Sequence, residues 1–390
     1  MTPGLRHWLT ALRSPAARSG EARNTFGVTR GPPHVRHAMS VDRAMNCVIV
    51  ALVPCLVVAL LNTGHQANLN MAQMGLKSAP GWRGAMLQTL AIGYDPSSLW
   101  ANMWHGALYY LPVLAVTAIV GAFWEWLFAT VRGRERAPGL AVVVLLFSLS
   151  LPPTILLWQV ALGATFGVLV AKEIFGGTGK NFLNPALAGL AFLYATYPKQ
   201  MVGEAAWTVV EGFTGATPLR VAEGGAMEAA TWAGTNWMLS FLGAVPGAFG
   251  ETSTLACVLG AAYLIVRRVA SGRIIAGALF GTIATALLFN YLVGAAVPLA
   301  NLSWHWHLTL GSFAFGVAFF ATDPVTAAGT NAGRWIYGIL IGGLVVVIRV
   351  ANVTHPDGVM FAILFGNIVA PLIDYLVMRA NIRRRARRRA

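Results

Sequence analysis

Charged residues are scarce in this sequence, and acidic ones above all. Only 11% of its 390 residues are charged and 56% are hydrophobic, whereas about a quarter of the residues of a soluble domain are usually charged. The three cysteines, Cys47, Cys55 and Cys257, include no CxxC pair, so this chain alone is not expected to supply an iron–sulfur cluster or a zinc site. The composition therefore excludes an ordinary soluble protein and indicates a membrane protein.

Long apolar runs recur along most of the chain. A bilayer core of about 30 Å requires roughly 20 apolar residues per helix, and backbone groups in lipid must be hydrogen-bonded within their own segment. The sequence therefore predicts an all-α polytopic membrane protein with about ten transmembrane segments. The predicted segments are 44–61, 107–130, 139–151, 154–175, 184–197, 255–269, 275–298, 308–322, 335–350 and 359–378.

The third segment, and less clearly the eighth, is too short to cross a bilayer alone. The third runs into LSLPP and the eighth into ATDP, as half helices do when they line a site inside a bundle. Residues 146–173 and 319–349 also share a pattern of a proline, a tryptophan and a glycine-containing apolar span. If the repeated unit has five helices, the two halves lie inverted in the membrane.

Basic residues set the predicted orientation. The net charge is +14, and ten crossings with an inner N-terminus put 23 of the 28 basic residues on the inner side, as the positive-inside rule requires. Both termini are then cytoplasmic, and the arginine-rich tail contacts lipid headgroups rather than nucleic acid. The predicted division is a cytoplasmic segment 1–43, a first repeat 44–198, an outer loop 199–254, a second repeat 255–378 and a basic tail 379–390.

Two motifs with familiar residue types do not support a catalytic or metal site. The run FGGTGKN at 175–181 lacks the spacing and the final hydroxyl of a phosphate-binding loop, so nucleotide hydrolysis is rejected. His305 and His307 lie two positions apart, which on a helix points them about 200° apart. An interfacial aromatic cluster is therefore expected there, with no metal bound.

Three acidic residues lie in or beside the predicted spans: Glu125, Asp323 and Asp374. An ionisable group at membrane depth is costly and usually serves an ion path, a proton relay or a buried pair. The alternative is that Glu125 and Asp374 lie near helix ends and pair with cytoplasmic arginines.

The stretch NFLNPALAG at 181–189 places two amides where the fifth segment begins. Asn181 or Asn184 can cap the helix, and Pro185 suits its first turn. Two amides beside glycines and a helix N-terminus could also hold the donor and acceptor edge of a heterocycle. The sequence leaves both roles open.

The stretch VVEGFTGATPLR at 209–220 lies in the outer loop according to the predicted topology. It carries two hydroxyls, those of Thr214 and Thr217, among small and flexible residues. Such a stretch is either a turn that closes the loop or an exposed attachment point for a cofactor.

These motifs carry a family resemblance. The stretches FGGTGKNFLNPALAGLAFLYATYP, WTVVEGFTGATPL, SWHWHLTLGSFAFGVAFFATDPV and VAKEIFGG resemble the family that contains the B subunit of the bacterial Na+-translocating NADH:quinone reductase and the D subunit of the Rnf complex. The resemblance extends from about His34 to the arginine tail. The long N-terminal segment and the SWHWHL motif favour the B subunit.

The resemblance implies a covalent flavin. In this family FMN is bound through its phosphate to the last threonine of the motif D-x-x-[ST]-G-A-[TS], which falls on Thr217. Thr214, Gly215 and Ala216 fill the preceding positions, and Glu211 stands where aspartate is usual. Because the carboxylate is retained on a longer arm, we expect a flavin transferase to modify this chain.

The resemblance also implies further sites and the family fold. Non-covalent riboflavin is expected at Asn181 and Asn184, and a quinone and inhibitor region at Gly121 with Ala122 beside it. Glu125 and Asp374 match acids implicated in cation uptake. The family fold has two inverted five-helix repeats, with half helices at the third and eighth positions.

The implied function is electron relay rather than general acid–base catalysis. Electrons from NADH would pass through the FAD, iron–sulfur centres and FMN of partner subunits to FMN on Thr217, then to riboflavin and ubiquinone. The chain would be one of six subunits in the bacterial inner membrane, coupled to Na+ or H+ translocation. The alternatives are the Rnf D subunit and a urea- or ammonium-type channel, although a channel has no use for a flavin attachment motif.

Overall fold

The structure, a computed structural model, describes residues 40–79, 81–133, 139–202, 217, 219, 222, 236–293, 297–351 and 357–388. The chain divides at Ser40, and the helices described below belong to the unit Val41–Ala390. Within the described ranges the secondary structure is helical, without β-strands. The predicted all-α class is therefore confirmed.

Each of the ten predicted segments contains a helix. Five helices are long and apolar enough to cross a membrane: α2 (Val41–Gln73), α4 (Leu99–Arg132), α12 (Gly272–Leu292), α15 (Asn331–Ala351) and α16 (Val359–Arg387). The fourth segment is α6 (Leu157–Thr165) continued by the π-helix η3 (Phe166–Glu173). Short helices complete the described chain: α3 (Gly81–Thr89), α8 (Pro198–Val202), α10 (Trp237–Leu242) and η7 (Pro298–Ala300).

The short segments differ in part from the prediction. The third is α5 (Leu140–Leu149), and the eighth is divided into α13 (Trp304–Thr309), α14 (Phe313–Phe315) and the π-helix η8 (Gly316–Phe320). The fifth and sixth, α7 (Pro185–Thr196) and α11 (Thr254–Val266), are also short. At 1.5 Å per residue, the 12 residues of α7 cover only about 18 Å. Half-length elements are thus more numerous than the two that the sequence predicts.

The broken end of α5 is satisfied by a loop from the second half of the chain. Helix α5 ends at Leu149, shortly before Pro152, which has no N–H to continue the helical ladder. Gly250 donates its N–H to the Leu149 carbonyl at 2.6 Å, and Phe249 donates to the Leu151 carbonyl at 3.3 Å. A broken helix at membrane depth is tolerated only where protein or a cavity covers it, and this loop supplies the cover.

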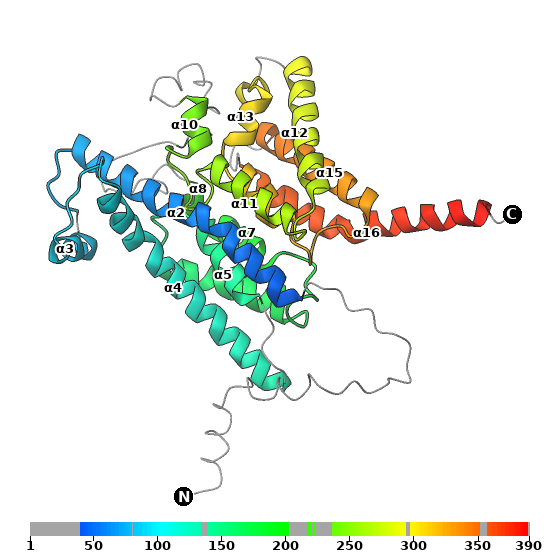
Figure 1. Ribbon diagram of the computed structural model, residues 1–390, viewed down its shortest axis with the longest axis horizontal. Coiled ribbons are helices and arrows are strands. Elements are labelled where there is room, and N and C mark those ends of the chain that lie inside the picture. Colours follow the sequence, from blue (N-terminus) through cyan, green and yellow to red (C-terminus); the bar gives the residue numbers. More distant parts are fainter. Residues whose placement is uncertain are drawn as a thin grey trace, which may run out of the picture. The chain divides into compact units, whose positions relative to one another are not determined.

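Close backbone contacts join the long helices (Figure 1). Helix α2 packs beside α4 and α11, and α12 packs beside α15. The α12–α15 contact uses Gly277 and Gly281 against Gly338 and Gly342, where an added Cβ would collide with the facing backbone. Such small-xxx-small pairs let membrane helices approach closely. The inverted relation of the two halves and the domain boundaries stay predictions.

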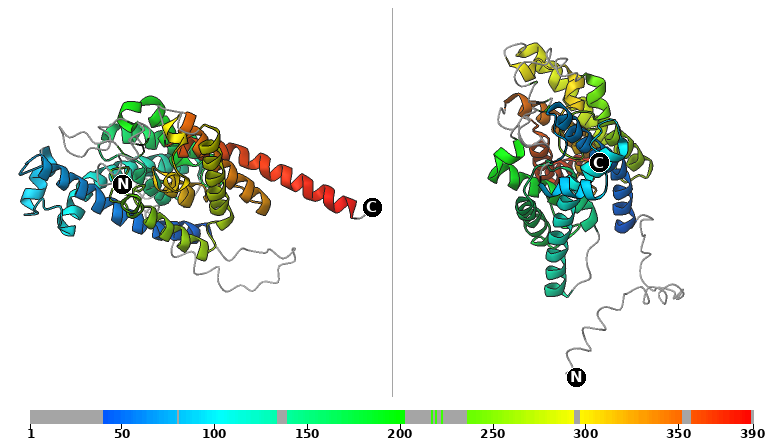
Figure 2. Two further views of the ribbon diagram at one scale, coloured as in Figure 1. Left: turned by 90° about the horizontal axis from the view of Figure 1, so that it is seen from above. Right: turned by 90° about the vertical axis from the view of Figure 1, so that its left-hand side faces the viewer.

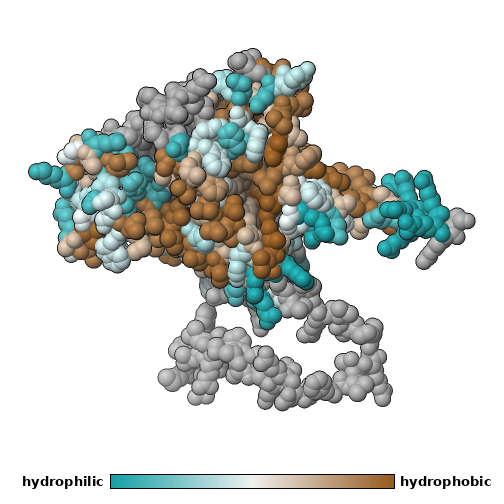
Figure 3. Space-filling model, turned by 45° about the horizontal axis from the view of Figure 1, so that its top comes forward, coloured by the Kyte–Doolittle hydropathy of each residue, from teal (hydrophilic) through white to brown (hydrophobic). Residues whose placement is uncertain are grey.

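The surface of the helices is mainly apolar (Figure 3). The C-terminal part of α16 extends beyond its neighbours in Figure 1 and in the left view of Figure 2, and it ends in a hydrophilic tip (Figure 3). The described arginines of this tip, from Arg379 to Arg388, are exposed. This arrangement suits a helix that leaves the hydrocarbon and enters a layer of charged headgroups.

Candidate functional site

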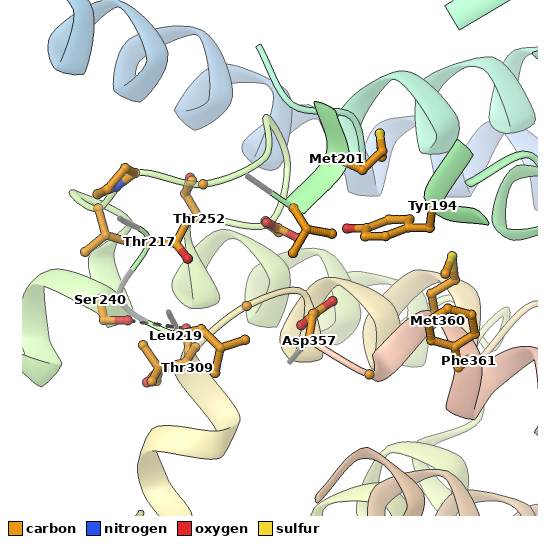
Figure 4. Close-up of a pocket in the computed structure, with 18 residues that line it drawn as sticks. Tyr194, Met201, Thr217, Leu219, Ser240, Thr252, Thr309, Asp357, Met360 and Phe361 are labelled. Carbon is orange, nitrogen blue, oxygen red and sulfur yellow. Dashed lines mark hydrogen bonds between the residues drawn. The ribbon is translucent and has the colours of Figure 1, made fainter. Parts of the chain in front are cut away.

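The larger of two pockets contains Thr217 (Figure 4). The space between its lining residues amounts to about 830 Å³, including the part that is open to solvent. Helices α7, α10, α13 and α16 each contribute to its wall. The lining includes Tyr194, Met201, Thr217, Leu219, Ser240, Glu251, Thr252, Thr309, Asp357, Met360 and Phe361.

The two ends of this pocket differ in chemistry. Figure 4 shows Thr217, Ser240, Thr252 and Thr309 at one end, and Tyr194, Met201, Met360 and Phe361 at the other. The Ser240 hydroxyl donates to the Thr309 carbonyl at 3.3 Å. Thr217 is partly exposed. A ligand with a polar tail and an aromatic body matches this division.

Of the predicted attachment motif, only Thr217 belongs to the described chain. Glu211, Thr214, Gly215 and Ala216 lie outside the described residues, and so do Pro218 and Arg220. Leu219, two positions after Thr217, is buried and lines the same pocket. The pocket therefore receives the end of the motif that the sequence singles out.

An acid that sequence reasoning misses lies in the pocket wall. Glu251 lies in the loop before α11, and its Oε1 accepts the Ala248 N–H at 3.0 Å. Burial, followed by the negative charge of Asp357, raises the pKa of Glu251 to about 8. Glu251 therefore carries a proton at neutral pH and can give or take one at a modest change in pH. Its position among several outer-loop glutamates offers no signal of this role.

A buried arginine, Arg349, positions Asp357 in the wall of the larger pocket. Arg349 is fully buried and donates to the carbonyl oxygens of His307 at 2.8 Å, Leu310 at 2.7 Å and Asp357 at 3.2 Å. Its Nη2 lies 3.4 Å from Asp357 Oδ1, and Asp357 also accepts hydrogen bonds from the N–H and hydroxyl of Ser312. Because a buried charge requires such partners, Arg349 fixes the position of the Asp357 turn.

The second pocket brings both predicted asparagines together with an acid and a lysine. It encloses about 640 Å³, and Asn181, Asn184, Asp323 and Lys172 line it. The rest of its wall is mostly apolar. Sequence reasoning treats the asparagines and Asp323 as separate hypotheses, because 139 residues separate Asn184 from Asp323.

Asn184 fills one of the two roles that the sequence leaves open, since it caps α7, and it also bonds to an acid from the second half of the chain. Its Oδ1 accepts the N–H groups of Ala186 at 3.0 Å and Leu187 at 3.4 Å, which caps α7. Its Nδ2 donates to Asp323 Oδ2 at 3.2 Å. Asn181 does not cap the helix, since its amide bonds within its own turn, to the Gly179 N–H and the Leu183 carbonyl. The capping residue is thus Asn184, and its amide nitrogen is committed to Asp323.

The three predicted acids lie in three different environments. Asp323 accepts from the Val325 N–H at 3.2 Å and the Thr326 hydroxyl at 3.1 Å, in addition to Asn184. Asp374, on α16, accepts from Gly329 and Thr330 in the turn before α15. Its hydrogen-bond partners are therefore a backbone turn and a hydroxyl, and the charge of Arg334, one of the arginines of the alternative prediction, also acts on it.

Glu125 is paired with a lysine. It lies on α4 with 6% of its surface exposed, and Lys172 on η3, with 1% exposed, forms an ion pair with it. A second pair, Arg132 with Glu173 at 3.1 Å, lies next to the first. Among the described residues, the ion-pair partner of Glu125 is thus Lys172 rather than an arginine, which corrects the alternative prediction.

The predicted quinone residues face different surroundings. Gly121 is buried, and a Cβ added there would lie 2.9 Å from Leu140 on α5. Ala122 is exposed on the outer surface of α4. Neither residue lines the two pockets.

The remaining candidates for metal binding have other contacts. His307 is buried beside Arg349, with its Nδ1 3.5 Å from the guanidinium, and His305 lies among tryptophan rings. Cys55 and Cys257 bring their sulfur atoms to 3.9 Å between α2 and α11 as free thiols. Within the described part of the chain, no three His, Cys, Asp or Glu residues gather as a metal site requires.

Comparison with known proteins assigns the class. The model of the NQR2, RnfD, RnfE family matches residues 28–383, and the chain belongs to this family. Among individual proteins it is similar to the B subunit of the Na(+)-translocating NADH-quinone reductase of Ectopseudomonas mendocina, with 51% identity over 375 residues that cover 94% of this chain and 93% of the relative. The proteins of the same name from Stutzerimonas stutzeri and Pseudomonas aeruginosa are 50% identical over the same shares. The family resemblance is confirmed.

Proposed function

We propose that this chain is the membrane flavoprotein subunit of an ion-pumping NADH:quinone oxidoreductase. Relatives named as the B subunit of this enzyme match nearly the whole chain at about half identity. The observation that carries the proposal is the position of Thr217 in the lining of the larger pocket.

The larger pocket fits FMN bound through its phosphate to the Thr217 hydroxyl. Ser240, Thr252 and Thr309 surround the attachment end with groups that bind phosphate oxygens, and Tyr194 and Phe361 lie at the aromatic end. Aromatic and thioether side chains favour the face and edge of a flat ring system. When bound, FMN would supply one- and two-electron transfer, which no amino-acid side chain of this site provides.

Residues of the chain would exchange protons near this flavin and would fix the backbone that surrounds it. Glu251, protonated at neutral pH, can exchange a proton with the pocket through its carboxyl oxygen. Arg349 holds Asp357 through its guanidinium and thereby fixes the turn between α15 and α16. Burial, with the negative charge of Asp357 as the second cause, keeps the proton on Glu251.

The second pocket is our proposed site for non-covalent riboflavin. Asn181 and Asp323 present an amide and a carboxylate, which suit the donor and acceptor edge of a flavin ring. Phe319, Leu146 and Val142 provide apolar walls for the ring. Electrons would pass from the flavin on Thr217 to this site and on to ubiquinone, which we expect near Gly121 and Ala122.

The remaining parts of the proposal concern assembly. We propose a complex of six subunits in the bacterial inner membrane, with both termini of this chain cytoplasmic and the basic tail on membrane lipid. The partners would deliver electrons from NADH, and a flavin transferase would modify Thr217. Coupled transport would move Na+ or H+, with Glu125, Asp323 and Asp374 as the proposed ion-path acids.

Flavin fluorescence of the denatured polypeptide on a gel tests the proposal. The chain is made together with a flavin transferase, and we expect a fluorescent band that is lost in Thr217→Ala and kept in Thr217→Ser. Thr89→Ala, a change at an exposed threonine on α3 outside the pocket, is the matched control and should keep the band. Absence of a band from the unmodified chain contradicts the flavoprotein function and favours the channel alternative.

The D subunit of the Rnf complex is the second candidate, because the matching family model covers RnfD as well. It would use the same two pockets but pass electrons between ferredoxin and NAD. The subunits that copurify with the chain distinguish the two complexes.

A further inference from the structure

Lys172 takes part both in the wall of the second pocket and in a buried ion pair. Its side chain lines the second pocket, and its ammonium group forms an ion pair with Glu125 on α4. Only 1% of Lys172 is exposed, so the pocket and the ion pair are its main surroundings. It lies in η3, a π-helix, and short π-helical stretches occur frequently at functional sites.

Charged groups of both signs surround Lys172. Glu125 and Arg132 on α4 and Glu173 on η3 are the neighbouring charged groups, and Asp323 faces the pocket from the segment after η8. Taking an ion out of water costs several kcal/mol per ion even in real proteins. Lys172 and Glu125 therefore stabilise each other, and a new negative charge in the pocket would compete with Glu125 for the same ammonium group.

We propose that Lys172 is a coupling residue, which shares its positive charge between Glu125 and the occupant of the second pocket. This inference rests on the proposed function, in which that occupant is a flavin. An occupant that took up one electron from a reduced flavin on Thr217, without a proton, would add one negative charge to the pocket that Asn181, Asp323 and Lys172 line. Lys172 is drawn toward that charge, Glu125 loses part of its counter-charge, and one monovalent cation binds at Glu125. One electron and one cation enter together, so the net charge of the cluster is unchanged.

A lysine is suited to act as a coupling residue between Glu125 and the occupant of the pocket. Its ammonium is a compact charge on a flexible four-carbon stem, and it can turn its three donors between two acceptors. An ion pair that only stabilises the fold does not have to line a pocket. The position of Lys172 on the pocket wall is therefore the feature that distinguishes a coupling residue from a simple buried pair.

Thermodynamic linkage between reduction of the pocket's occupant and cation binding at Glu125 makes the inference measurable. If reduction of the pocket's occupant raises cation affinity at Glu125, the cation must raise the reduction potential by the same free energy. A tenfold increase in affinity corresponds to 59 mV for a one-electron step. The cation is either Na+ or H+, and titrating the potential against sodium at fixed pH, then against pH at fixed sodium, identifies which.

The experiment uses the whole purified complex and follows the absorbance of the non-covalent flavin during redox titration. In the unchanged complex we expect the potential to rise with one of the two cations. Lys172→Met and Glu125→Gln should both abolish that dependence while shifting the potential in opposite directions. Lys172→Met lowers it because a positive charge is removed, and Glu125→Gln raises it because a negative charge is removed. Lys172→Arg should keep the dependence.

Three results overturn the inference. These are a cation dependence that survives in Lys172→Met, shifts of the same sign in the two variants, and loss of the non-covalent flavin from both. The last result would show that the pair only holds the pocket together. In all three cases a fluorescent covalent band in the gel test leaves the proposed function standing. Absence of that band from the unchanged chain would contradict both the inference about Lys172 and the proposed function.

Discussion

The amide nitrogen of Asn184 donates to Asp323 Oδ2 at 3.2 Å and so joins two points 139 residues apart in the chain. Asn184 begins α7 in the first half, and Asp323 follows η8 in the second. Both residues line the second pocket. The pocket therefore lies where two short helices from the two halves meet, as expected for a site between broken helices.

Replacing Asn184 by serine separates its two roles. A serine oxygen can still cap α7, but no amide N–H remains for Asp323. Because Asp323 then lacks one of its hydrogen bonds, and hydrogen bonds to charged groups are worth about 1.5–3 kcal/mol, we expect a lower thermal midpoint and, since the Asp323 carboxylate is no longer held in place, a lower riboflavin content. Extraction of non-covalent flavin from the purified complex measures the effect. Asn236→Ser is the matched control, because Asn236 caps α10 outside this pocket; full riboflavin content in Asn184→Ser would refute the pocket assignment.

The raised pKa of Glu251 predicts a specific dependence of stability on pH. Its pKa is raised from 4.5 to about 8 in the folded protein, so between these values the folded state holds a proton that the unfolded state has released. The free energy of unfolding therefore falls as pH rises, and this contribution is fully present below pH 4.5 and lost as pH passes through about 8. Glu251→Gln should remove the fall.

Thermal unfolding in detergent from about pH 6 to about pH 9, a range that brackets the raised pKa, checks this prediction. Asp95→Asn is the control, because Asp95 is an exposed acid whose pKa is lowered by hydrogen bonds from Ser97 and which does not titrate in this range. Parallel curves for the unchanged protein and Glu251→Gln would contradict the raised pKa of Glu251.

Gly121 and Ala122 should respond differently to enlargement. Gly121→Val forces side-chain atoms against Leu140 and should cost about 1–3 kcal/mol of stability, as overpacking of a filled core does. Ala122→Val adds atoms to an exposed surface and should change stability by less than about 0.5 kcal/mol. Thermal unfolding measures both variants. A rise in KM for ubiquinone in Ala122→Val at unchanged stability would place the quinone against this surface, whereas equal stability losses would contradict the packing described.

Asp374 is expected to matter first for stability. It accepts hydrogen bonds from the Gly329 N–H at 2.6 Å and from the N–H and hydroxyl of Thr330, immediately before α15 begins. Loss of such a cap costs about 0.5–2 kcal/mol, and we expect Asp374→Asn to lower the thermal midpoint by several degrees. The exposed neighbour change Tyr375→Phe is the control. A changed sodium affinity at unchanged stability would instead favour the ion-path role.

Much of the fold follows from composition and from the apolar segments. All ten predicted segments contain helices, and the prolines after α5 and η8 mark real breaks. The short lengths of α7 and α11 are missed, because apolarity continues past a helix end when the following loop is also covered by protein. The π-helices are missed as well, since one extra residue per turn leaves little trace in an apolar sequence.

The sites are predictable to the extent that a motif marks them. Local patterns draw attention to Thr214 and Thr217 and to Asn181 and Asn184, and the family resemblance selects Thr217. Thr217 and the two asparagines each line a pocket. Glu251, Arg349 and Lys172 are not identified, because their surroundings come from helices distant in the sequence. A charge distribution alone cannot show which acid faces which base across a bundle, and in the sequence Lys172 counts only as an inner-side cation.

The most direct test of the account is mass spectrometry of the tryptic peptide 200–220. The chain is purified after production with a flavin transferase, and fragmentation locates any added group. The account predicts a mass increased by FMN less one water, with the modification on Thr217. An unmodified peptide, or a flavin carried by Thr214, would contradict it.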